Sequence, residues 1–403
     1  MTTTINNEQK KLNVPNLRFK EFEGEWEKKT IGEISTIKNG PFGSVLHAED
    51  YVDEGMPIVT TEHFKNGNLP QSKNGIPQVS DDDYYRLRGY KLEKDDIVFS
   101  RVGSIDINAH VEQSQQGWLF SGRVLRVRPI KSVNSLCLHY ILSTESVKRS
   151  IRNRAVGQTM PSINTPILSN TKINIPQSVV EQKKIANLLA LLDKRIAIQN
   201  KIIEDLKKLK CAIIEKLYAE VKGTKYSYRQ LFNIINERNK QLEYSNVLSA
   251  SQEKGMVSRE ELNLDIQFER SNINTYKIVR NGDYVIHLRS FQGGFAFSEK
   301  TGVCSPAYTI LSPNGLLVYG YLSYYFTSRE FIQSLIIVTY GIRDGRSINV
   351  DEWLDLKVVI PSKEQQSHIV NVIKSIENKI KNEETHSNCL LNQKKYLLRQ
   401  MFI

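Results

Sequence analysis

Two stretches of the chain repeat apolar residues in alternating steps of three and four, with polar residues between them. Each position of the first stretch recurs in the second at an offset of 184, as Leu189 does in Ile373. A narrow apolar seam of about four heptads is typical of a coiled coil. We therefore predict two long helices within residues 181–222 and 364–403, with these seam residues: Leu189, Leu192, Ile196, Ile203, Leu206, Ile213, Leu217, Ile373, Ile376, Ile380, Leu390, Leu397 and Met401.

Polar residues interrupt the two seams at matching places, where Gln199 corresponds to Glu383 and Lys210 to Lys394. Polar groups in a seam cost stability but can fix register and partner choice. Each helix could pack on its own domain, or the two could pair with each other. The length of the narrow seam favours pairing, and an antiparallel pair, roughly 55 Å long at 1.5 Å per residue, would hold two globular domains at opposite ends.

The sequence before each helix also repeats. Lys172–Pro176 (KINIP) recurs at an offset of 185 as KVVIP, ending at Pro361, and Ser162-Ile163-Asn164 recurs at the same offset. Asp96 within DDIV corresponds to Asp283 within GDYV. Near the start, the segment from Trp26 resembles that from Tyr226, at an offset of 200. Matching ends with differing interiors predict two domains of one fold that recognise different things.

Both domains have a mixed pattern of short alternating runs and helical stretches. Residues 122–128 and 308–311 read as strands, whereas 136–151 and 319–337 read as helices with apolar faces. The predicted fold class is mixed α+β, with two globular domains, two long helices and a pseudo-twofold internal repeat. The predicted domains are residues 1–180 and 223–363, each followed by one of the helices.

Composition limits the class of protein and its partners. The 403 residues are 40% hydrophobic and 25% charged, typical of a folded protein, and the net charge of +11 favours a polyanionic partner such as nucleic acid. No CxxC pair occurs among the four cysteines, and no apolar run approaches membrane-spanning length. We expect a cytoplasmic protein without a membrane partner.

Motifs for catalysis are missing from the sequence. An adenine methyltransferase would carry an (N/D)PP(Y/F) tetrapeptide and an ATP motor a GxxxxGK[ST] loop, and the chain has neither. The seven histidines show no metal-ligand spacing, and Asp81-Asp82-Asp83 reads as a solvated turn. We predict no catalytic residue and no metal site.

Polar and basic residues in turn-like segments are the candidates for contact with DNA. Arg and Lys suit guanine or phosphate, Asn and Gln suit adenine, and glycine permits close approach of backbone to phosphate. In the first domain the candidates are Lys38, Asn39, Gly40, Gly43, Ser44, Thr60, Glu62, His63, Arg101, Ser104, Arg154 and Gln158. In the second domain they are Arg238, Asn239, Ser251, Gln252, Arg289, Ser290, Arg343 and Arg346.

Several motifs make the sequence similar to the specificity subunits of type I restriction–modification systems. They are Asn16-Leu17-Arg18-Phe19 through Trp26, the loop Gly40–Ser44, the stretch Gly302–Tyr308, and the two domain exits, in which Ile-Pro is followed by Glu181-Gln182 or Glu364-Gln365. The resemblance covers nearly the whole chain, and two such exits, each closing a repeat, are its most specific element.

The resemblance implies a non-catalytic subunit. Its two target-recognition domains would read the two halves of a bipartite double-stranded DNA target. Its helix pair would act as a spacer and dock two methylation (M) subunits, which restriction (R) subunits join. Any S-adenosylmethionine, ATP and Mg²⁺ would then belong to the partner subunits and none to this chain.

A second interpretation stays open at this point. A non-catalytic coiled-coil scaffold with two protein-interaction domains would fit the same geometry. Dependence on DNA distinguishes the two interpretations.

Overall fold

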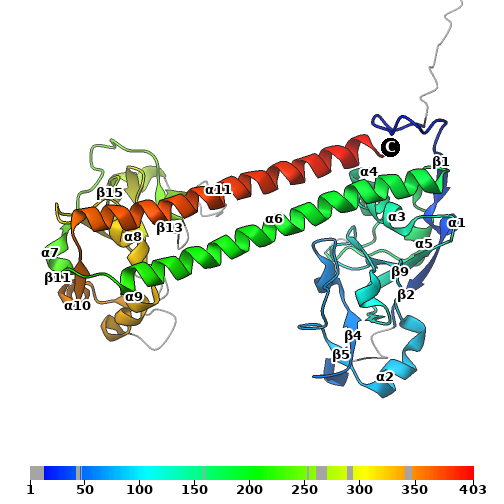
Figure 1. Cartoon of the computed structure of the whole chain (residues 1–403), viewed down its shortest axis with the longest axis horizontal. Coiled ribbons are helices and arrows are strands. Elements are labelled where there is room, and N and C mark those ends of the chain that lie inside the picture. Colours follow the sequence, from blue (N-terminus) through cyan, green and yellow to red (C-terminus); the bar gives the residue numbers. More distant parts are fainter. Residues whose placement is uncertain are drawn as a thin grey trace, which may run out of the picture. The chain divides into compact units, whose positions relative to one another are not determined.

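The computed structural model describes residues 13–41, 46, 48–157, 159–251, 254–259, 270–287, 294–340 and 347–403. The chain forms two compact units (Figure 1). Unit 1 consists of Met1–Gln199 and His386–Ile403, and unit 2 of Asn200–Thr385. The division passes through both long helices, so that each unit contains a part of each helix.

Two long helices are confirmed, and both begin directly after the proline-terminated strands. Helix α6 extends over Val179–Ala219 and α11 over Lys363–Gln400. The shorter helices are α1 Ile31–Ile34, α2 Asp81–Arg86, α3 Ser135–Leu142, α4 Glu145–Arg152, α5 Thr165–Ser169, α7 Tyr228–Leu231, α8 Tyr321–Tyr325, α9 Arg329–Ser334 and α10 Val350–Asp355. In the described residues no helix has the length and apolarity needed to cross a bilayer.

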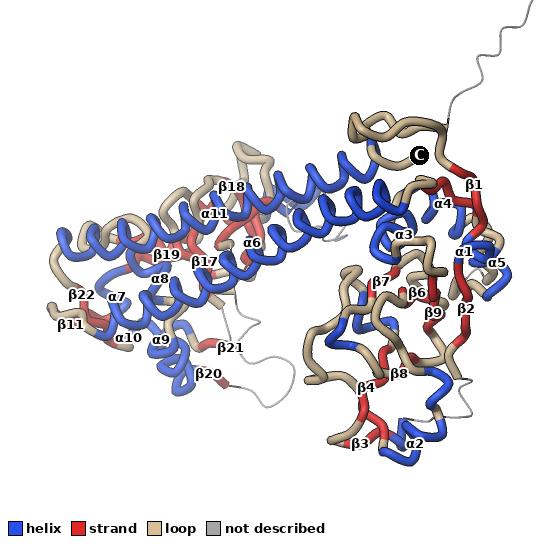
Figure 2. Tube along the Cα trace, turned by 45° about the vertical axis from the view of Figure 1, so that its right-hand side comes forward, coloured by secondary structure: helices blue, strands red, loops and turns tan. Residues whose placement is uncertain are grey.

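Each unit contains an antiparallel four-stranded sheet of the same topology (Figure 2). The order is β2-β9-β6-β7 in unit 1 and β12-β19-β16-β17 in unit 2. In unit 1 these strands are β2 Ser35–Asn39, β9 Val124–Pro129, β6 Ile97–Ser100 and β7 Asn108–His110. In unit 2 they are β12 Phe232–Ile235, β19 Thr309–Pro313, β16 Tyr284–Ile286 and β17 Phe295–Phe297. The repeat predicted from the sequence is therefore a repeat of the sheet.

A two-stranded ribbon leads into each long helix. Strand β1 (Glu27–Thr30) pairs with β10 (Lys172–Ile175), and β11 (Thr224–Ser227) pairs with β22 (Lys357–Ile360), both antiparallel. At the end of the first strand, Thr30 and Ser227 form capping boxes with Glu33 and Gln230. The capping residues Thr30 and Ser227 correspond at an offset of 197, so the predicted offset of 200 between the segments at Trp26 and Tyr226 was wrong by three positions.

A tight turn ahead of the central strand also repeats. Asp96 Oδ2 accepts from the Glu93 amide at 2.8 Å, and Asp283 Oδ2 accepts from the Arg280 amide at 2.7 Å. The residue before each aspartate has a positive φ, 69° at Asp95 and 97° at Gly282. The matching of Asp96 with Asp283 is therefore confirmed, because both side chains close the same turn.

The connecting segments differ between the units. Unit 1 inserts a four-stranded sheet of order β3-β5-β4-β8, with the strands β3 Tyr51–Val52, β5 Gln78–Val79, β4 Met56–Val59 and β8 Leu119–Phe120. In the same place, between β12 and β19, the described part of unit 2 has two two-stranded ribbons: β13 Leu248–Ser251 with β14 Gly255–Ser258, and β15 Lys277–Val279 with β18 Gly302–Cys304. A third ribbon, β20 Thr339–Tyr340 with β21 Ser347–Ile348, follows β19.

Both predicted helical stretches of the globular domains are interrupted. Residues 136–151 contain α3 and α4, separated at Ser143-Thr144. Residues 319–337 contain α8, α9 and a 3-10 turn. The breaks turn the chain so that both helices of each pair bury their apolar faces in the main core of their unit.

Candidate nucleic-acid interface

The two long helices pair antiparallel within each unit, as predicted. In unit 1, Leu192 and Ile196 of α6 form an apolar cluster with Leu390 and Leu397 of α11. Lys394 Nζ lies 2.5 Å from Asp193 Oδ1 in the same region.

The same polar contact recurs in unit 2 with the roles of the helices exchanged. There Lys210 of α6 lies 3.0 Å from Glu377 of α11. Asp193 and Lys210 are separated along α6 by the same number of positions as Glu377 and Lys394 along α11. The pairings in the two units therefore have one register. The lysines that interrupt the seam are neutralised by carboxylates on the opposite helix.

Each of these ion pairs also involves a tyrosine of the globular domain. Tyr140 donates to Asp193 Oδ2 at 2.8 Å, and Tyr324 donates to Glu377 Oε2 at 2.8 Å. Burial, followed by the neighbouring carboxylate, raises the pKa of both tyrosines, so they remain protonated donors. The sequence analysis missed these tyrosines, because the signal is only that Tyr140 and Tyr324 share the offset of 184 found for the helices.

The predicted seam residues are all turned away from solvent, to different degrees. Those that are buried are Leu189, Leu192, Ile196, Ile373, Ile380, Leu390 and Met401. Those that are half-buried are Ile203, Leu206, Ile213, Leu217, Ile376 and Leu397. Leu189 and Met401 belong to the core of unit 1 and Ile373 to the core of unit 2. The seam thus merges at its ends into the globular domains.

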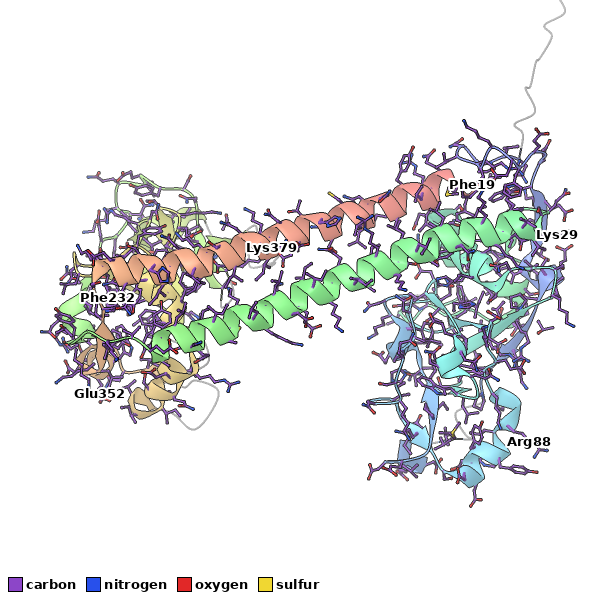
Figure 3. All side chains as sticks on the ribbon, viewed as in Figure 1. Phe19, Lys29, Arg88, Phe232, Glu352 and Lys379 are labelled. Atoms are coloured by element: carbon purple, nitrogen blue, oxygen red, sulfur yellow. The ribbon has the colours of Figure 1, made fainter. Side chains whose placement is uncertain are left out.

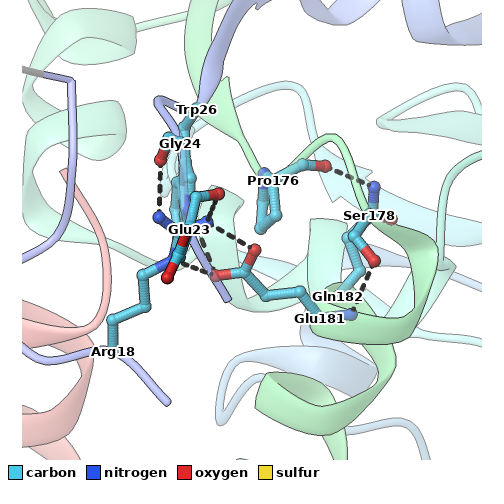
Figure 4. Close-up of polar contacts among 8 residues, drawn as sticks. All are labelled: Arg18, Glu23, Gly24, Trp26, Pro176, Ser178, Glu181 and Gln182. Atoms are coloured by element: carbon cyan, nitrogen blue, oxygen red, sulfur yellow. Dashed lines mark hydrogen bonds and ion pairs between the residues drawn. The ribbon is translucent and has the colours of Figure 1, made fainter. Parts of the chain in front are cut away.

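A buried glutamine fastens the first turn of each long helix to its own domain. Gln182 donates to the Pro176 carbonyl at 2.8 Å (Figure 4). It also accepts from the Asn134 amide at 2.7 Å. Gln366 donates to the Pro361 carbonyl at 3.0 Å and accepts from the Val318 amide at 2.8 Å. The equivalent of Gln182 is therefore Gln366 and not Gln365, which corrects the alignment of the two Glu-Gln pairs by one residue.

The residue beside this glutamine differs between the units. Glu181 is buried and accepts two hydrogen bonds from Arg18, at 2.7 and 2.9 Å, and one from Trp26 Nε1 at 3.3 Å (Figure 4). The hydrogen bond to Glu181 raises the pKa of Arg18. The corresponding Gln365 is exposed. The Asn16–Phe19 motif thus has a structural explanation, because it fastens the entry segment to α6.

The entry segment also contacts the end of α11. The Leu17 amide donates to the Gln400 carbonyl at 2.9 Å, and Trp26 packs edge-on to Phe402 with ring centroids 6.0 Å apart. Phe19 packs against the core of unit 1 at the end of α11 (Figure 3).

The first three candidates for DNA contact lie at the end of β2, next to the gap in the described residues. Lys38 Nζ donates to the Gly89 carbonyl at 2.7 Å, and Asn39 Oδ1 accepts from Thr165 at 3.1 Å. Gly40 is buried, and a Cβ atom there would lie 1.9 Å from the Ser121 carbonyl oxygen. The glycine at position 40 is therefore explained by packing against Ser121, and its predicted approach to phosphate is not needed.

The next candidates occupy two surface turns of unit 1. Thr60 precedes the 3-10 turn Thr61–Phe64, and its amide lies 3.1 Å from His63 Nδ1. Burial lowers the pKa of His63, and Glu62 is exposed beside Lys65. In the other turn, Ser104 is exposed and Arg101 donates to the Gly122 carbonyl at 3.2 Å. Of these side chains, Glu62 and Ser104 are exposed, whereas Thr60, His63 and Arg101 are half-buried.

Arg154 has a structural role that the sequence did not reveal. Its guanidinium donates to the Ser150 carbonyl at 3.0 Å, to Ser150 Oγ at 3.2 Å, to the Asn170 carbonyl at 3.3 Å and to Thr171 Oγ1 at 2.6 Å. Four of its five N–H donors are thus used within the domain. Its prediction as a DNA contact is not supported by this geometry.

Of the candidates in unit 2, Asn239 is buried. Asn239 is 1% exposed, and its side chain donates to the Tyr244 carbonyl at 2.7 Å and accepts from the Tyr244 amide at 3.2 Å. This geometry does not support the prediction that Asn239 contacts DNA, because its buried amide already bonds within its own loop. The neighbouring Arg238 is exposed and lines an open hollow with Lys240. Ser251 is half-buried at the end of β13.

The remaining candidates lie outside the described residues. They are Gly43, Ser44, Gln158, Gln252, Arg289, Ser290, Arg343 and Arg346. Among the residues that the structure does describe, no group of three or more His, Cys, Asp or Glu side chains is placed to hold a metal ion.

Part of the chain is similar in sequence to known proteins. Residues 23–208 match the family model of the type I restriction modification DNA specificity domain. A MjaX type I restriction enzyme specificity subunit of Methanocaldococcus jannaschii is 30% identical over 221 residues, which cover 52% of this chain and 49% of that protein. The MjaVIII specificity subunit of the same organism is 24% identical over 199 residues, covering 48% and 45%. The chain thus matches about half the length of these relatives.

Solved structures share the fold of nearly the whole chain. The S subunit of a type I restriction–modification system from M. genitalium superposes with a TM-score of 0.55 over 97% of this chain and 99% of that one, at 15% identity. A chain from a structure describing complex assembly and conformational transition of the type I R-M system gives a TM-score of 0.57 over 93% and 97%, at 12% identity. The chain therefore shares the two-domain fold of these proteins. In sequence, about half of the chain is similar to the DNA specificity domain and the specificity subunits of type I restriction–modification systems.

Proposed function

We propose that this chain is the non-catalytic DNA-recognition subunit of a type I restriction–modification complex. Each globular unit would read one half of a two-part sequence in double-stranded DNA. The paired helices would set the distance between the halves and dock two methylation subunits, with restriction subunits completing the assembly. S-adenosylmethionine, ATP and Mg²⁺ would act on those partner subunits.

The repeated frame with unlike connecting segments carries this proposal. The two units have the same four-stranded sheet and the same exit ribbon, yet unit 1 has an inserted four-stranded sheet where unit 2 has two-stranded ribbons. Loops between rigid elements are where recognition residues usually lie. Two recognition domains with the same sheet and different loops suit a DNA target with two unlike halves.

Exposed apolar residues on α6 support a protein partner. Leu191 and Ile198 in unit 1 and Ile202 and Leu209 in unit 2 are 40–68% exposed. Their spacing in steps of seven, four and seven places them on one side of the helix, beside the seam. Such a stripe is suited to another helix, and we assign it to the methylation subunits.

The first test measures DNA binding by the complex of this chain with a methylation subunit. We expect sequence-specific binding whose affinity falls steeply with salt as counterions are released. Arg238→Ala should weaken recognition of one half-site and reduce the salt slope by about 0.9, whereas Lys216→Ala, an exposed charge on α6, should change neither. Salt-independent binding, or no preference for a bipartite site, would favour the scaffold interpretation instead.

The second test changes the length of the helix pair. One heptad inserted after Gln199 in α6 alone should shift the two parts of α6 by seven residues relative to α11, so that the ion pairs of the two units can no longer form together. Assembly should therefore be impaired. A matched insertion in α11 should restore pairing and lengthen the recognised spacing by about 10 Å, or about three base pairs. Unchanged spacing in a well-assembled double variant would contradict the proposed spacer role.

A further inference from the structure

Unit 1 contains a groove of about 730 Å³ between the α3–α4 corner, the turn at residues 65–68 and the last turns of α11. Its lining includes apolar residues, which are Ile107, Leu391, Leu398, Phe402 and Ile403. Its lining also contains the cations Lys148, Lys395 and Arg399, for which the described residues provide no ion-pair partner. The groove therefore combines an apolar surface with uncompensated positive charge.

The N-terminus of α4 lies in this lining and has no cap. Thr144 Oγ1 donates to the Ile141 carbonyl at 2.7 Å instead of accepting from the helix. Among the described residues no acceptor faces the amides of Glu145, Ser146 and Val147, and the Glu145 carboxylate pairs with Arg152. Free first-turn amides favour an anion.

The internal repeat shows what occupies the equivalent place in unit 2. At the N-terminus of α9, the Arg329 amide donates to Glu215 Oε1 of α6 at 2.8 Å, and the Phe331 amide donates to Ser328 Oγ at 3.3 Å. Position 145 corresponds to 329 and position 399 to 215, both at the offset of 184 found for the helices. Unit 2 thus supplies a carboxylate to this helix from the long helix opposite, and unit 1 has Arg399 in its place.

Two further positions change in the same direction. Lys395 corresponds to Cys211, and Lys148 corresponds to Ile332. Unit 1 therefore has three cations where unit 2 has one acid and two uncharged residues. Unit 1 thus lacks the carboxylate that bonds to the helix in unit 2. Its three cations instead attract an anion from solution.

His139 adds a hydrogen-bond acceptor to the lining. It is 7% exposed, and its Nδ1 lies 2.7 Å from Asn108 Oδ1, while Asn108 Nδ2 donates to Ser143 at 3.1 Å. Because Asn108 Oδ1 can only accept, Nδ1 carries the proton and Nε2 is a bare acceptor without a donor among the described residues. Burial lowers the pKa of His139 to about 3, so the ring stays neutral.

We propose that this groove binds a nucleoside phosphate. Its phosphate would lie at the N-terminus of α4 with Lys148, Lys395 and Arg399, and its base against the apolar residues, with an N–H group available to His139 Nε2. Inorganic phosphate would leave the apolar residues and His139 unused. The site is separate from the proposed recognition of a DNA sequence and does not depend on it.

Titration calorimetry of the full chain with AMP tests the proposal, with inorganic phosphate and adenosine as fragments. We expect AMP to bind at least about tenfold more tightly than either fragment, since it uses both parts of the groove. Arg399→Glu recreates the carboxylate of unit 2 and should weaken AMP at least about tenfold. Arg195→Glu, which makes the same charge change at an exposed position of α6, is the matched control and should bind as the unaltered chain does.

Three results would overturn the proposal. They are absence of AMP binding, equal binding by the Arg399→Glu and Arg195→Glu variants, and phosphate binding as tightly as AMP. A short duplex that displaces AMP from the unaltered chain would also overturn it, by assigning the cations to the DNA backbone. A melting temperature for Arg399→Glu at or above that of Arg195→Glu excludes unfolding as the cause of lost binding.

Discussion

The two globular units share a frame but fill it with different side chains. In unit 2, Trp353 is fully buried and stacks on Tyr228 with ring centroids 4.2 Å apart, within a cluster that includes Phe295, Phe326 and Phe331. The core of unit 1 is mainly aliphatic, with Trp26 at its edge against Phe402. What the units keep in common lies at the joints with the helices: the glutamine at the helix start and the tyrosine, carboxylate and lysine contact. These contacts between domain and helix, the joints, are thus more constrained than the cores. Different apolar side chains can fill a core of the same volume, whereas a buried hydrogen-bond donor needs its acceptor.

The largest expected difference comes from the aromatic core of unit 2. Trp353→Ala should destabilise unit 2 by about 4 kcal/mol, since it removes a fully buried indole and leaves a cavity. Hydrogen exchange followed by mass spectrometry can assign the loss to peptides of unit 2. The exposed Tyr396 provides the control, Tyr396→Ala. A loss spread equally over unit 1 would show that the cores are not independent.

A smaller effect is expected at the helix start, where the units differ in charge. Arg18→Ala leaves the Glu181 carboxylate buried without its cation and should cost unit 1 about 3 kcal/mol. Gln365→Ala, at the position equivalent to Glu181, should change stability by less than about 0.5 kcal/mol, because that side chain is exposed. Denaturant unfolding of both variants measures the difference, and similar losses would contradict the asymmetry.

Acid should destabilise unit 1 through a group that unit 2 lacks, because the position equivalent to His139 is Ser323. The folded pKa of His139 is depressed to about 3 by burial. The unfolded chain binds the proton near about pH 6.5. The stability contribution is therefore complete above about pH 6.5 and is lost as pH falls towards 3, by up to about 1.4 kcal/mol per pH unit. His139→Gln should flatten the pH profile of unit 1 over this range, and an unchanged profile would assign the loss to other groups.

The smallest effect tests how closely the joints match. Double-mutant cycles for Lys394 with Asp193 and for Lys210 with Glu377 should each give about 0.5–1 kcal/mol, because both pairs are about one-third exposed. Equal coupling energies would support the equivalence of the joints. A pair with no coupling would show that its geometry is retained without contributing to stability.

Much of the helix pair could be predicted from the sequence, because a heptad pattern is local and repeats over many turns. The long helices, their antiparallel pairing and the matching of Asp96 with Asp283 followed from spacing alone. The contacts of Tyr140 and Tyr324 could not, since each joins three elements that are distant in sequence. The alignment of Glu181-Gln182 with Glu364-Gln365 was wrong by one residue for a related reason. It matched identical residues, whereas only the structure shows that Gln366 occupies the equivalent buried position.

Single candidate residues for DNA contact were harder to judge. Asn239 and Arg154 look like recognition residues in the sequence, because polar side chains in turns serve loops and ligands alike. Only burial and hydrogen-bond partners distinguish the two uses. Gly40 gave the same difficulty, since a glycine that permits close approach does not reveal whether the neighbour is a phosphate or the carbonyl of Ser121.

The glutamine at each helix start has a consequence for how such a protein can diverge. Gln182 and Gln366 tie the helix to the exit strand and to the loop before α3 or α8, all of which belong to the shared frame. The segments that differ between the units contribute no atom to these bonds. Insertions and substitutions there can accumulate without changing the angle at which a domain meets its helix. The glutamine thereby makes each domain an exchangeable module. Its recognition loops can evolve while its attachment to the helix stays the same.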